Sequence, residues 1–121
     1  MADSVQKEPL PLETTLFASD VKLDDLRQAM AVFCNERGWE RFHTPRNLLL
    51  AMTGEVGELA EIFQWRGECA PFCAQTWSER DREHLGEELS DVLLYLVRLS
   101  DRCGIDLATA ALRKMALNRK K

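Results

Sequence analysis

The sequence predicts an all-α protein, a bundle of four helices that self-association completes. Apolar residues recur at helical spacing through two long stretches, residues 48–63 and 85–99. Strand-like alternation of apolar and polar residues is scarce, and each expected helix has a recognisable capping residue, proline or glycine at one of its ends. A chain of 121 residues is long enough for one domain with its own core.

The chain divides into an N-terminal arm, residues 1–19, and an all-α domain, residues 20–121. The arm holds two prolines and has no helical period, so we expect it to be partly flexible. The first helix is expected to run from an N-cap at Asp20 to Arg37, with Gly38 ending it. The link that follows, residues 39–43, is rich in aromatic side chains. These form either an edge of the core or a platform on which a planar base can stack.

The second and third helices are expected at residues 45–66 and from Ser78 to about Arg102, separated by a loop. Thr44 is the N-cap of the first of them, and Pro45 takes its first position. Its apolar and acidic residues cover about 200° of the helix surface, too wide an arc for one neighbour to cover. Residues 92–97 are apolar on every side, and a lone chain of this size can hardly bury them. The natural remedy is a homo-oligomer, either a two-fold dimer or a dimer of dimers.

A fourth helix is expected after an N-cap at Asp106, and Lys114 and Asn118 lie one turn apart on it. These two side chains could reach one ligand, although a lysine on a terminal helix more often faces solvent. The net charge of −4, from 16 basic and 20 acidic residues, argues against a nucleic-acid partner. The start of the chain shows neither a signal peptide nor a membrane span, so we expect a cytoplasmic protein. The four cysteines lack zinc-site spacing. Cys69 and Cys73 could cross-link under oxidation, but without an export signal we expect all four to be reduced.

Two acidic pairs lie inside the long apolar stretches, Glu55 with Glu58 and Glu88 with Asp91. A spacing of three residues places both members of a pair on one helix face. A carboxylate in an apolar setting needs a proton, a basic partner or a metal ion. One such pair is usually solvated, but two pairs embedded in apolar stripes favour a metal site. An all-oxygen ligand set without a histidine pair favours Mg²⁺, with Mn²⁺ as the alternative, over Zn²⁺.

These motifs resemble a known family. The two acidic segments on consecutive helices, followed by Lys114-Met115-x-x-Asn118, resemble the all-α nucleoside triphosphate pyrophosphohydrolases of the MazG-like superfamily. Three longer runs, residues 39–51, 54–65 and 87–96, resemble its dCTP pyrophosphatase branch more narrowly. The likeness extends from about residue 23 to residue 119. Gly54 stands where the superfamily pattern has the first of two adjacent glutamates.

The resemblance implies a Mg²⁺-dependent hydrolase that converts a dNTP, namely dCTP or a modified dCTP, to the monophosphate and pyrophosphate as nucleotide-pool house-cleaning. It assigns the metal to four acids: Glu55, Glu58, Glu88 and Asp91. It assigns substrate contacts to seven further residues: Trp39, His43, Asn47, Trp65, Tyr95, Lys114 and Asn118. It also implies a homotetramer with sites between neighbouring subunits.

In the mechanism we expect, a water activated by the metal attacks the α-phosphorus, and Glu58 or Glu61 acts as the general base. Lys114 takes up charge on the leaving pyrophosphate. The alternative from another class is a non-catalytic α-helical oligomeric interaction protein in which the acids are interface charges. That protein would release no pyrophosphate, and Mg²⁺ would not affect its stability.

Overall fold

The structure of the protein is a computed structural model that describes residues 16–121. Over that range the chain forms four α-helices, two short 3₁₀ turns and no strand, which confirms the predicted all-α class. The helices are α1 (Leu23–Glu36), α2 (Pro45–Arg66), α3 (Glu79–Arg102) and α4 (Leu107–Asn118), and the 3₁₀ turns are Glu40–Phe42 and Cys73–Thr76. Most of the expected arm, residues 1–15, lies outside the described residues.

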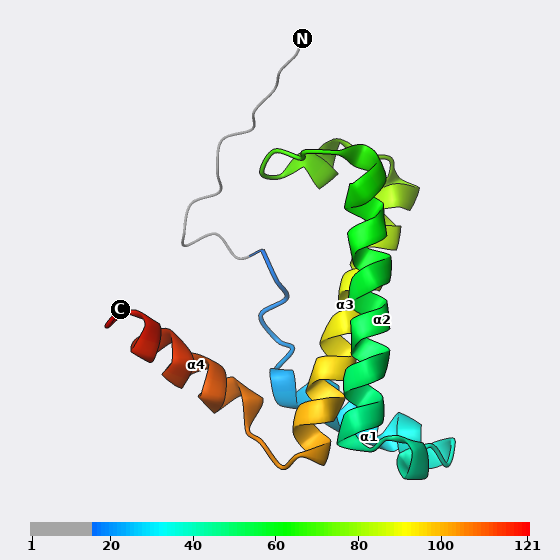
Figure 1. Cartoon of the computed structure of the whole chain (residues 1–121), viewed down its shortest axis with the longest axis vertical. Coiled ribbons are helices and arrows are strands. Elements are labelled where there is room, and N and C mark those ends of the chain that lie inside the picture. The colour runs from blue at the N-terminus through cyan, green and yellow to red at the C-terminus, as the bar shows by residue number, and fades with distance from the viewer. Residues whose placement is uncertain (1–15) are drawn as a thin grey trace.

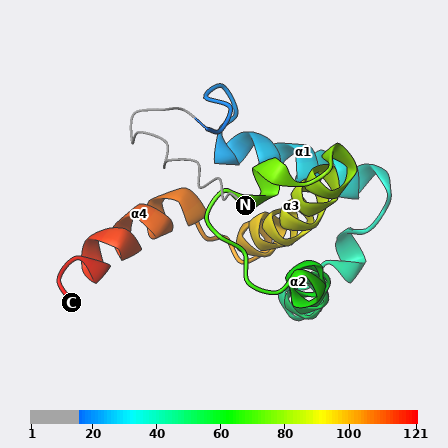
Figure 2. The same ribbon diagram turned by 90° about the horizontal axis from the view of Figure 1, so that it is seen from above.

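The two longest helices, α2 and α3, lie side by side and run in opposite directions (Figure 1). Helix α3 lies between α2 and α1 and packs against both of them (Figure 2). Helix α4 leaves the end of α3 and extends away from this three-helix unit (Figure 1). In the described part of the chain, α1, α2 and α3 therefore form the packed unit, with α3 in contact with both of the others.

Three of the four helix starts agree with the predicted capping residues. The side-chain oxygens of Thr44, Ser78 and Asp106 accept hydrogen bonds from backbone N–H groups three residues ahead, at 3.1 to 3.2 Å. Each bond satisfies one of the N–H groups that a helix start leaves free. The predicted boundaries of α2 and α3 are confirmed.

The predicted start of α1 at Asp20 is wrong. The helix begins at Leu23, after Lys22, because the carboxylate of Asp25 accepts a hydrogen bond of 2.8 Å from the Lys22 backbone N–H. That bond closes the first turn two residues later than a side chain at Asp20 would. The helix also ends at Glu36, one residue before the predicted end.

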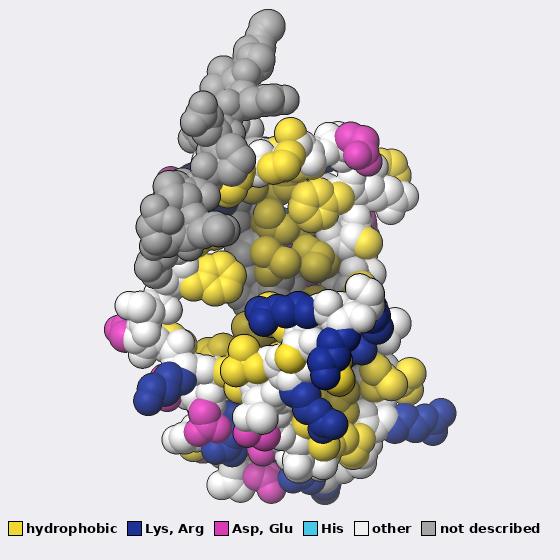
Figure 3. Space-filling view, turned by 90° about the vertical axis from the view of Figure 1, so that its left-hand side faces the viewer, with side chains coloured by type: hydrophobic (Ala, Val, Ile, Leu, Met, Phe, Trp, Pro, Cys, Tyr) yellow, Lys and Arg dark blue, Asp and Glu magenta, His cyan; other side chains and the backbone are white. Residues whose placement is uncertain are grey.

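The core of the single chain is small. Among residues 16–121, the buried apolar side chains are Cys34, Leu48 and Val97, one from each of α1, α2 and α3. Larger apolar side chains remain exposed on α2 and α4, and Leu93 in the all-apolar part of α3 is 39 % exposed. Figure 3 shows hydrophobic side chains exposed on the face from which α4 projects. One chain therefore leaves much of its apolar surface uncovered.

The expectation that all four cysteines are reduced is wrong for one pair. Cys69 and Cys73 form a disulfide within the loop between α2 and α3, with their Cα atoms 5.8 Å apart. Their four-residue separation across the turn before Cys73–Thr76 brings the two Cα atoms within normal disulfide range. Cys34 is buried and free, and Cys103 is exposed and free. Among the helices that the structure describes, none combines the length and apolar composition that a bilayer crossing requires.

Removing the α2 cap should weaken the fold. We expect Thr44→Ala to lower the free energy of unfolding by about 1 kcal/mol, because the Asn47 N–H loses its partner. Urea unfolding at one fixed protein concentration measures this loss. The control is Thr53→Ala, in the middle of the same helix, where alanine has the higher helix propensity. Equal stability of the two variants would show that Thr44 is no cap.

Candidate metal and nucleotide site

Three carboxylates meet where α2 faces α3. Glu55 comes from the middle of α2, and Glu88 and Asp91 come from α3, with one oxygen of each side chain lying within 4.8 Å of the others. The three-residue spacing of Glu88 and Asp91 turns both toward α2. The antiparallel packing of the two helices therefore brings together acids that lie more than thirty residues apart.

Two oxygens of this cluster are buried without a hydrogen-bond donor, one on Glu55 and one on Glu88. The other oxygen of Glu88 lies 3.4 Å from Nε2 of His84. Burial raises the pKa of Glu55, and the negative charges of Glu58, Asp91 and Glu88 raise it further. A buried carboxylate oxygen with no donor is costly. The unpaired oxygens and the all-carboxylate ligand set fit a divalent cation of the Mg²⁺ or Mn²⁺ type.

Glu58 and Glu61 lie beside this cluster, on the following turns of α2. The charge of Glu58 acts on Glu55, but its carboxylate is not one of the three that converge. Both glutamates are exposed and line a cavity of about 610 Å³ next to the cluster. A cavity of this size is large enough for a nucleotide-sized ligand.

The cavity joins acidic and aromatic side chains from α2, α3 and the loop between them. Its lining includes Glu58, Glu61, Trp65, Trp77, His84 and Glu88. Trp65 is 78 % exposed, while the Trp77 ring packs against Phe63 at 5.8 Å between centroids and carries the Arg66 guanidinium 3.8 Å from its centre. The sequence reasoning missed Trp77 because a loop tryptophan ahead of a capping box has no spacing that links it to the acids.

Predicted substrate residues at the other end of α2 form a second group. The rings of Trp39 and His43 lie 6.0 Å apart, and Phe33 meets Trp39 edge to face at 5.4 Å. The side-chain amide of Asn47 donates to the backbone carbonyl of Phe42 at 3.0 Å and holds the turn into α2. This amide group is therefore engaged in local structure.

Tyr95 lies beside the acids on α3. It lies one turn after Asp91 on α3 and is half-buried. Burial raises the pKa of Tyr95, and the charges of Glu55 and Asp91 raise it further, so the phenol lies close to the carboxylates. Its high pKa keeps the hydroxyl protonated and able to donate.

The single chain does not bring Lys114 and Asn118 to the acidic cluster. Both are exposed on α4, which points away from the three-helix unit (Figure 1). Within one chain they are separate from the other predicted site residues.

Because the pKa of Glu55 is raised, we expect the stability of the folded protein to depend on pH. In the presence of a metal chelator, the Glu55 carboxyl binds a proton more tightly in the folded chain than in the unfolded chain, where its pKa is near 4.5. The free energy of unfolding should therefore fall as pH rises above 4.5 and through the folded pKa. Urea unfolding between pH 4 and pH 8 measures this slope.

Glu55→Gln should flatten the slope and raise stability at pH 8, because the amide carries no charge there. Glu87→Gln, on the exposed side of α3, is the control and should leave the slope unchanged. An unchanged slope in Glu55→Gln would mean that Glu55 ionises freely in the folded protein.

Known proteins resemble this chain over most of its length. It is 56 % identical over 107 residues to dCTP pyrophosphatase 1 of Homo sapiens, and 52 % identical over 105 residues to that of Mus musculus. Each alignment covers 87 % of this chain and 61 % of the relative. The chain thus spans about three fifths of the length of the curated relatives it matches.

The fold agrees with that likeness. The crystal structure of a pyrophosphatase from Archaeoglobus fulgidus matches 88 % of this chain and 96 % of its own, with a TM-score of 0.70 at 34 % identity. Residues 51–121, which hold the acidic segments and α4, match the model of the MazG-like family. The family resemblance predicted from the sequence is thereby confirmed: this chain belongs to the MazG-like family.

Proposed function

We propose that this protein is a metal-dependent nucleoside triphosphate pyrophosphohydrolase that converts a dNTP and water to a dNMP and pyrophosphate. The observation that carries the proposal is the convergence of Glu55, Glu88 and Asp91, with two buried carboxylate oxygens that have no donor. The relatives named dCTP pyrophosphatase 1 support dCTP, or a modified dCTP, as the substrate. The likeness to an archaeal pyrophosphatase structure supports hydrolysis of a phosphoanhydride bond.

The metal that suits this site is Mg²⁺, with Mn²⁺ as a substitute, because every converging ligand is a carboxylate. Glu55, Glu88 and Asp91 would hold it, and Glu58, one turn from Glu55, is the candidate for a fourth ligand. When bound, such an ion neutralises phosphate oxygens and lowers the pKa of water.

The protein's own groups then orient the substrate and handle the proton. Glu58 or Glu61, exposed at the wall of the 610 Å³ cavity, is placed to take a proton from the attacking water. The protonated Tyr95 hydroxyl is a donor beside the carboxylates. Trp65 and Trp77 offer aromatic faces to a planar base in the same cavity.

The predicted substrate contacts support a site shared between copies of the chain. His43 precedes α2 and Trp65 lies near its end, and the 22 residues of that helix span about 33 Å. One nucleotide is too short to touch both residues in a single chain. An antiparallel pairing of two copies along α2 would bring Trp65 of one copy toward the His43 end of the other.

Exposed apolar groups on α2 favour such a pairing. Leu49, Val56 and Phe63 recur every seven residues, so they form one stripe along the helix, and all three are exposed. Gly54 and Gly57 lie in the same helix, and a Cβ added to either would meet nothing in the single chain. Helical glycine costs about 1 kcal/mol relative to alanine, a cost that the close approach of a second backbone would explain. We propose a homo-oligomer built as a dimer of dimers, in which α4 of a neighbour supplies Lys114 and Asn118.

The reaction can be tested directly. The protein is incubated with Mg²⁺ and a panel of dNTPs and NTPs, and monophosphate and pyrophosphate are quantified by chromatography. We expect dCMP and pyrophosphate from dCTP, and a loss of about 10²- to 10⁴-fold in turnover for Glu58→Gln. Glu87→Gln should keep the wild-type rate.

Three results would contradict the proposal. Release of phosphate without pyrophosphate from every triphosphate would exclude this reaction. A wild-type rate in Glu58→Gln would exclude the assigned role of Glu58. Absence of any turnover would favour the non-catalytic oligomeric protein instead.

The assembly has its own test by sedimentation equilibrium. We expect the wild-type protein to be oligomeric at micromolar concentration and Val56→Lys to shift it toward the monomer, because a charge would be buried in the apolar stripe. The matched control is Val32→Lys on α1, where the valine is 57 % exposed compared with 46 % for Val56. A monomeric wild-type protein, or equal dissociation of both variants, would rule out pairing through this stripe.

A further inference from the structure

Arg98 on α3 is the buried charged residue of the described chain, with 2 % of its surface exposed. A guanidinium removed from water is costly unless its charge and its donors are matched. Arg98 directly follows the apolar residues 92–97, whose side chains are stabilised by burial. Its partners must therefore account for its position.

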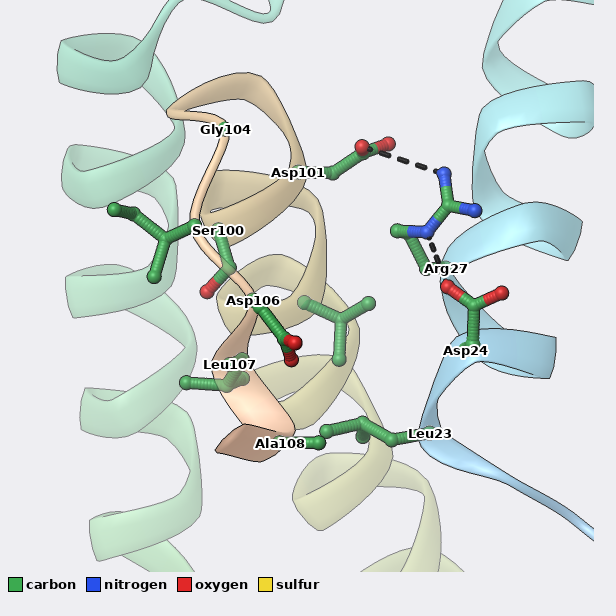
Figure 4. Close-up of a pocket in the computed structure, with 11 residues that line it drawn as sticks. Leu23, Asp24, Arg27, Ser100, Asp101, Gly104, Asp106, Leu107 and Ala108 are labelled. Carbon is green, nitrogen blue, oxygen red and sulfur yellow. Dashed lines mark hydrogen bonds and ion pairs between the residues drawn. The ribbon is translucent and has the colours of Figure 1, made fainter. Parts of the chain in front are cut away.

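The partners of Arg98 compensate its charge only in part. Nη1 of Arg98 lies 3.4 Å from one carboxylate oxygen of Asp101. The other oxygen of Asp101 lies 3.5 Å from Nη1 of Arg27, and Arg27 also pairs with Asp24 (Figure 4). Asp101 is thus shared by two arginines, and Nη2 of Arg98 is buried without an acceptor. Such an arrangement is a poor one for stability alone.

The remaining donor of Arg98 points to His43. Nε of Arg98 lies 3.2 Å from Nδ1 of His43. A guanidinium can donate hydrogen bonds but cannot accept them, so Nδ1 must supply a lone pair. A neutral imidazole that accepts at Nδ1 carries its proton on Nε2.

A second arginine fixes the backbone of the same residue. Arg102, one turn after Arg98 on α3, donates from Nε to the carbonyl oxygen of His43 at 3.1 Å. Burial lowers the pKa of His43, and the positive charges of Arg98 and Arg102 lower it further. The ring is therefore held neutral, in one orientation, beside the ring of Trp39 at 6.0 Å. Within residues 16–121, Nε2 of His43 makes no hydrogen bond.

We propose that Arg98 is a positioning residue that locks His43 as the Nε2–H tautomer, so that His43 offers one fixed hydrogen-bond donor to an acceptor of the bound nucleoside. The acceptors of that class are a keto oxygen or unprotonated ring nitrogen of a pyrimidine and a sugar hydroxyl oxygen. The nucleoside part of this inference rests on the proposed function, whereas the lock itself does not. Arg98 acts through His43 and touches no reacting atom.

The lock can be tested in the protein without substrate. The chain has only two histidines, so ¹⁵N-histidine labelling and a long-range ¹H–¹⁵N correlation spectrum resolve both rings, and His43→Gln assigns them. We expect His43 in the wild-type protein to have an unprotonated Nδ1 and a protonated Nε2, and to titrate at lower pH than an ordinary histidine. A protonated Nδ1 in the neutral ring would overturn the proposal, and this result needs no variant.

Two arginine variants distinguish the hydrogen bond between Arg98 and Nδ1 of His43 from the general effect of nearby positive charge. Arg98→Met should give mixed tautomers and raise the pKa of His43 toward its ordinary value of 6.5. Arg102→Met removes a nearby charge and the bond to the His43 carbonyl but should keep Nδ1 unprotonated. Circular dichroism checks that both variants are folded. A His43 spectrum unchanged in folded Arg98→Met would overturn the proposal.

Kinetics test the nucleoside contact separately. Arg98→Met should raise KM for dCTP by about three- to tenfold, as expected for one misplaced hydrogen bond, with kcat changed less than twofold. A fall in kcat with unchanged KM would overturn the positioning role. The 3′-deoxy analogue of dCTP distinguishes the base acceptors from the sugar hydroxyl. With this analogue as substrate, the effect of Arg98→Met on KM should disappear only if the sugar hydroxyl is the hydrogen-bond partner of His43. A wild-type protein without turnover would contradict the proposed function, while the spectra would still decide the lock.

Discussion

Negative charge concentrated between two apolar helix faces is the constraint on which the rest of the structure depends. Glu55, Glu88 and Asp91 occupy the contact between α2 and α3, where hydrophobic side chains would stabilise the pair at lower cost. Two of their oxygens have no donor, and the pKa of Glu55 is raised. When all these carboxylates are ionised, their mutual repulsion destabilises the contact between α2 and α3. A divalent cation held by these carboxylates would offset their repulsion and would supply a Lewis acid at this interface.

The single chain holds the acids but not a complete site around them. Aromatic groups stand at opposite ends of α2, and α4 carries its polar residues away from the bundle. The same helix exposes a stripe of apolar side chains. One process, the pairing of copies along α2, would cover the stripe and assemble the separated groups. In the pairing we propose, self-association and substrate binding would both depend on this surface of α2.

Much of this arrangement is readable from the sequence because it depends on local chemistry. Thr44, Ser78 and Asp106 mark helix starts through bonds to N–H groups three residues ahead, and the spacing of Glu88 and Asp91 fixes their common face. The start of α1 was misplaced because an aspartate inside the helix, rather than one before it, closes the first turn.

What the sequence did not predict depends on contacts between distant segments. Arg98 follows an apolar run and is buried with His43, 55 residues earlier in the chain. Trp77 lies in the loop after α2 and lines the cavity together with side chains of both α2 and α3. No residue pattern in or beside α4 predicts that this helix points away from the bundle. Tertiary packing decides the contacts of Arg98 and Trp77.

The most direct measurement is the location of a metal in crystals of the protein grown with Mn²⁺. Anomalous differences collected at the manganese edge should place an ion between the carboxylates of Glu55, Glu88 and Asp91, and crystals of Glu88→Gln should show a weaker peak or none. An ion that settles elsewhere, or a cluster that stays free of manganese while its oxygens bind only protons or side chains, would contradict the account.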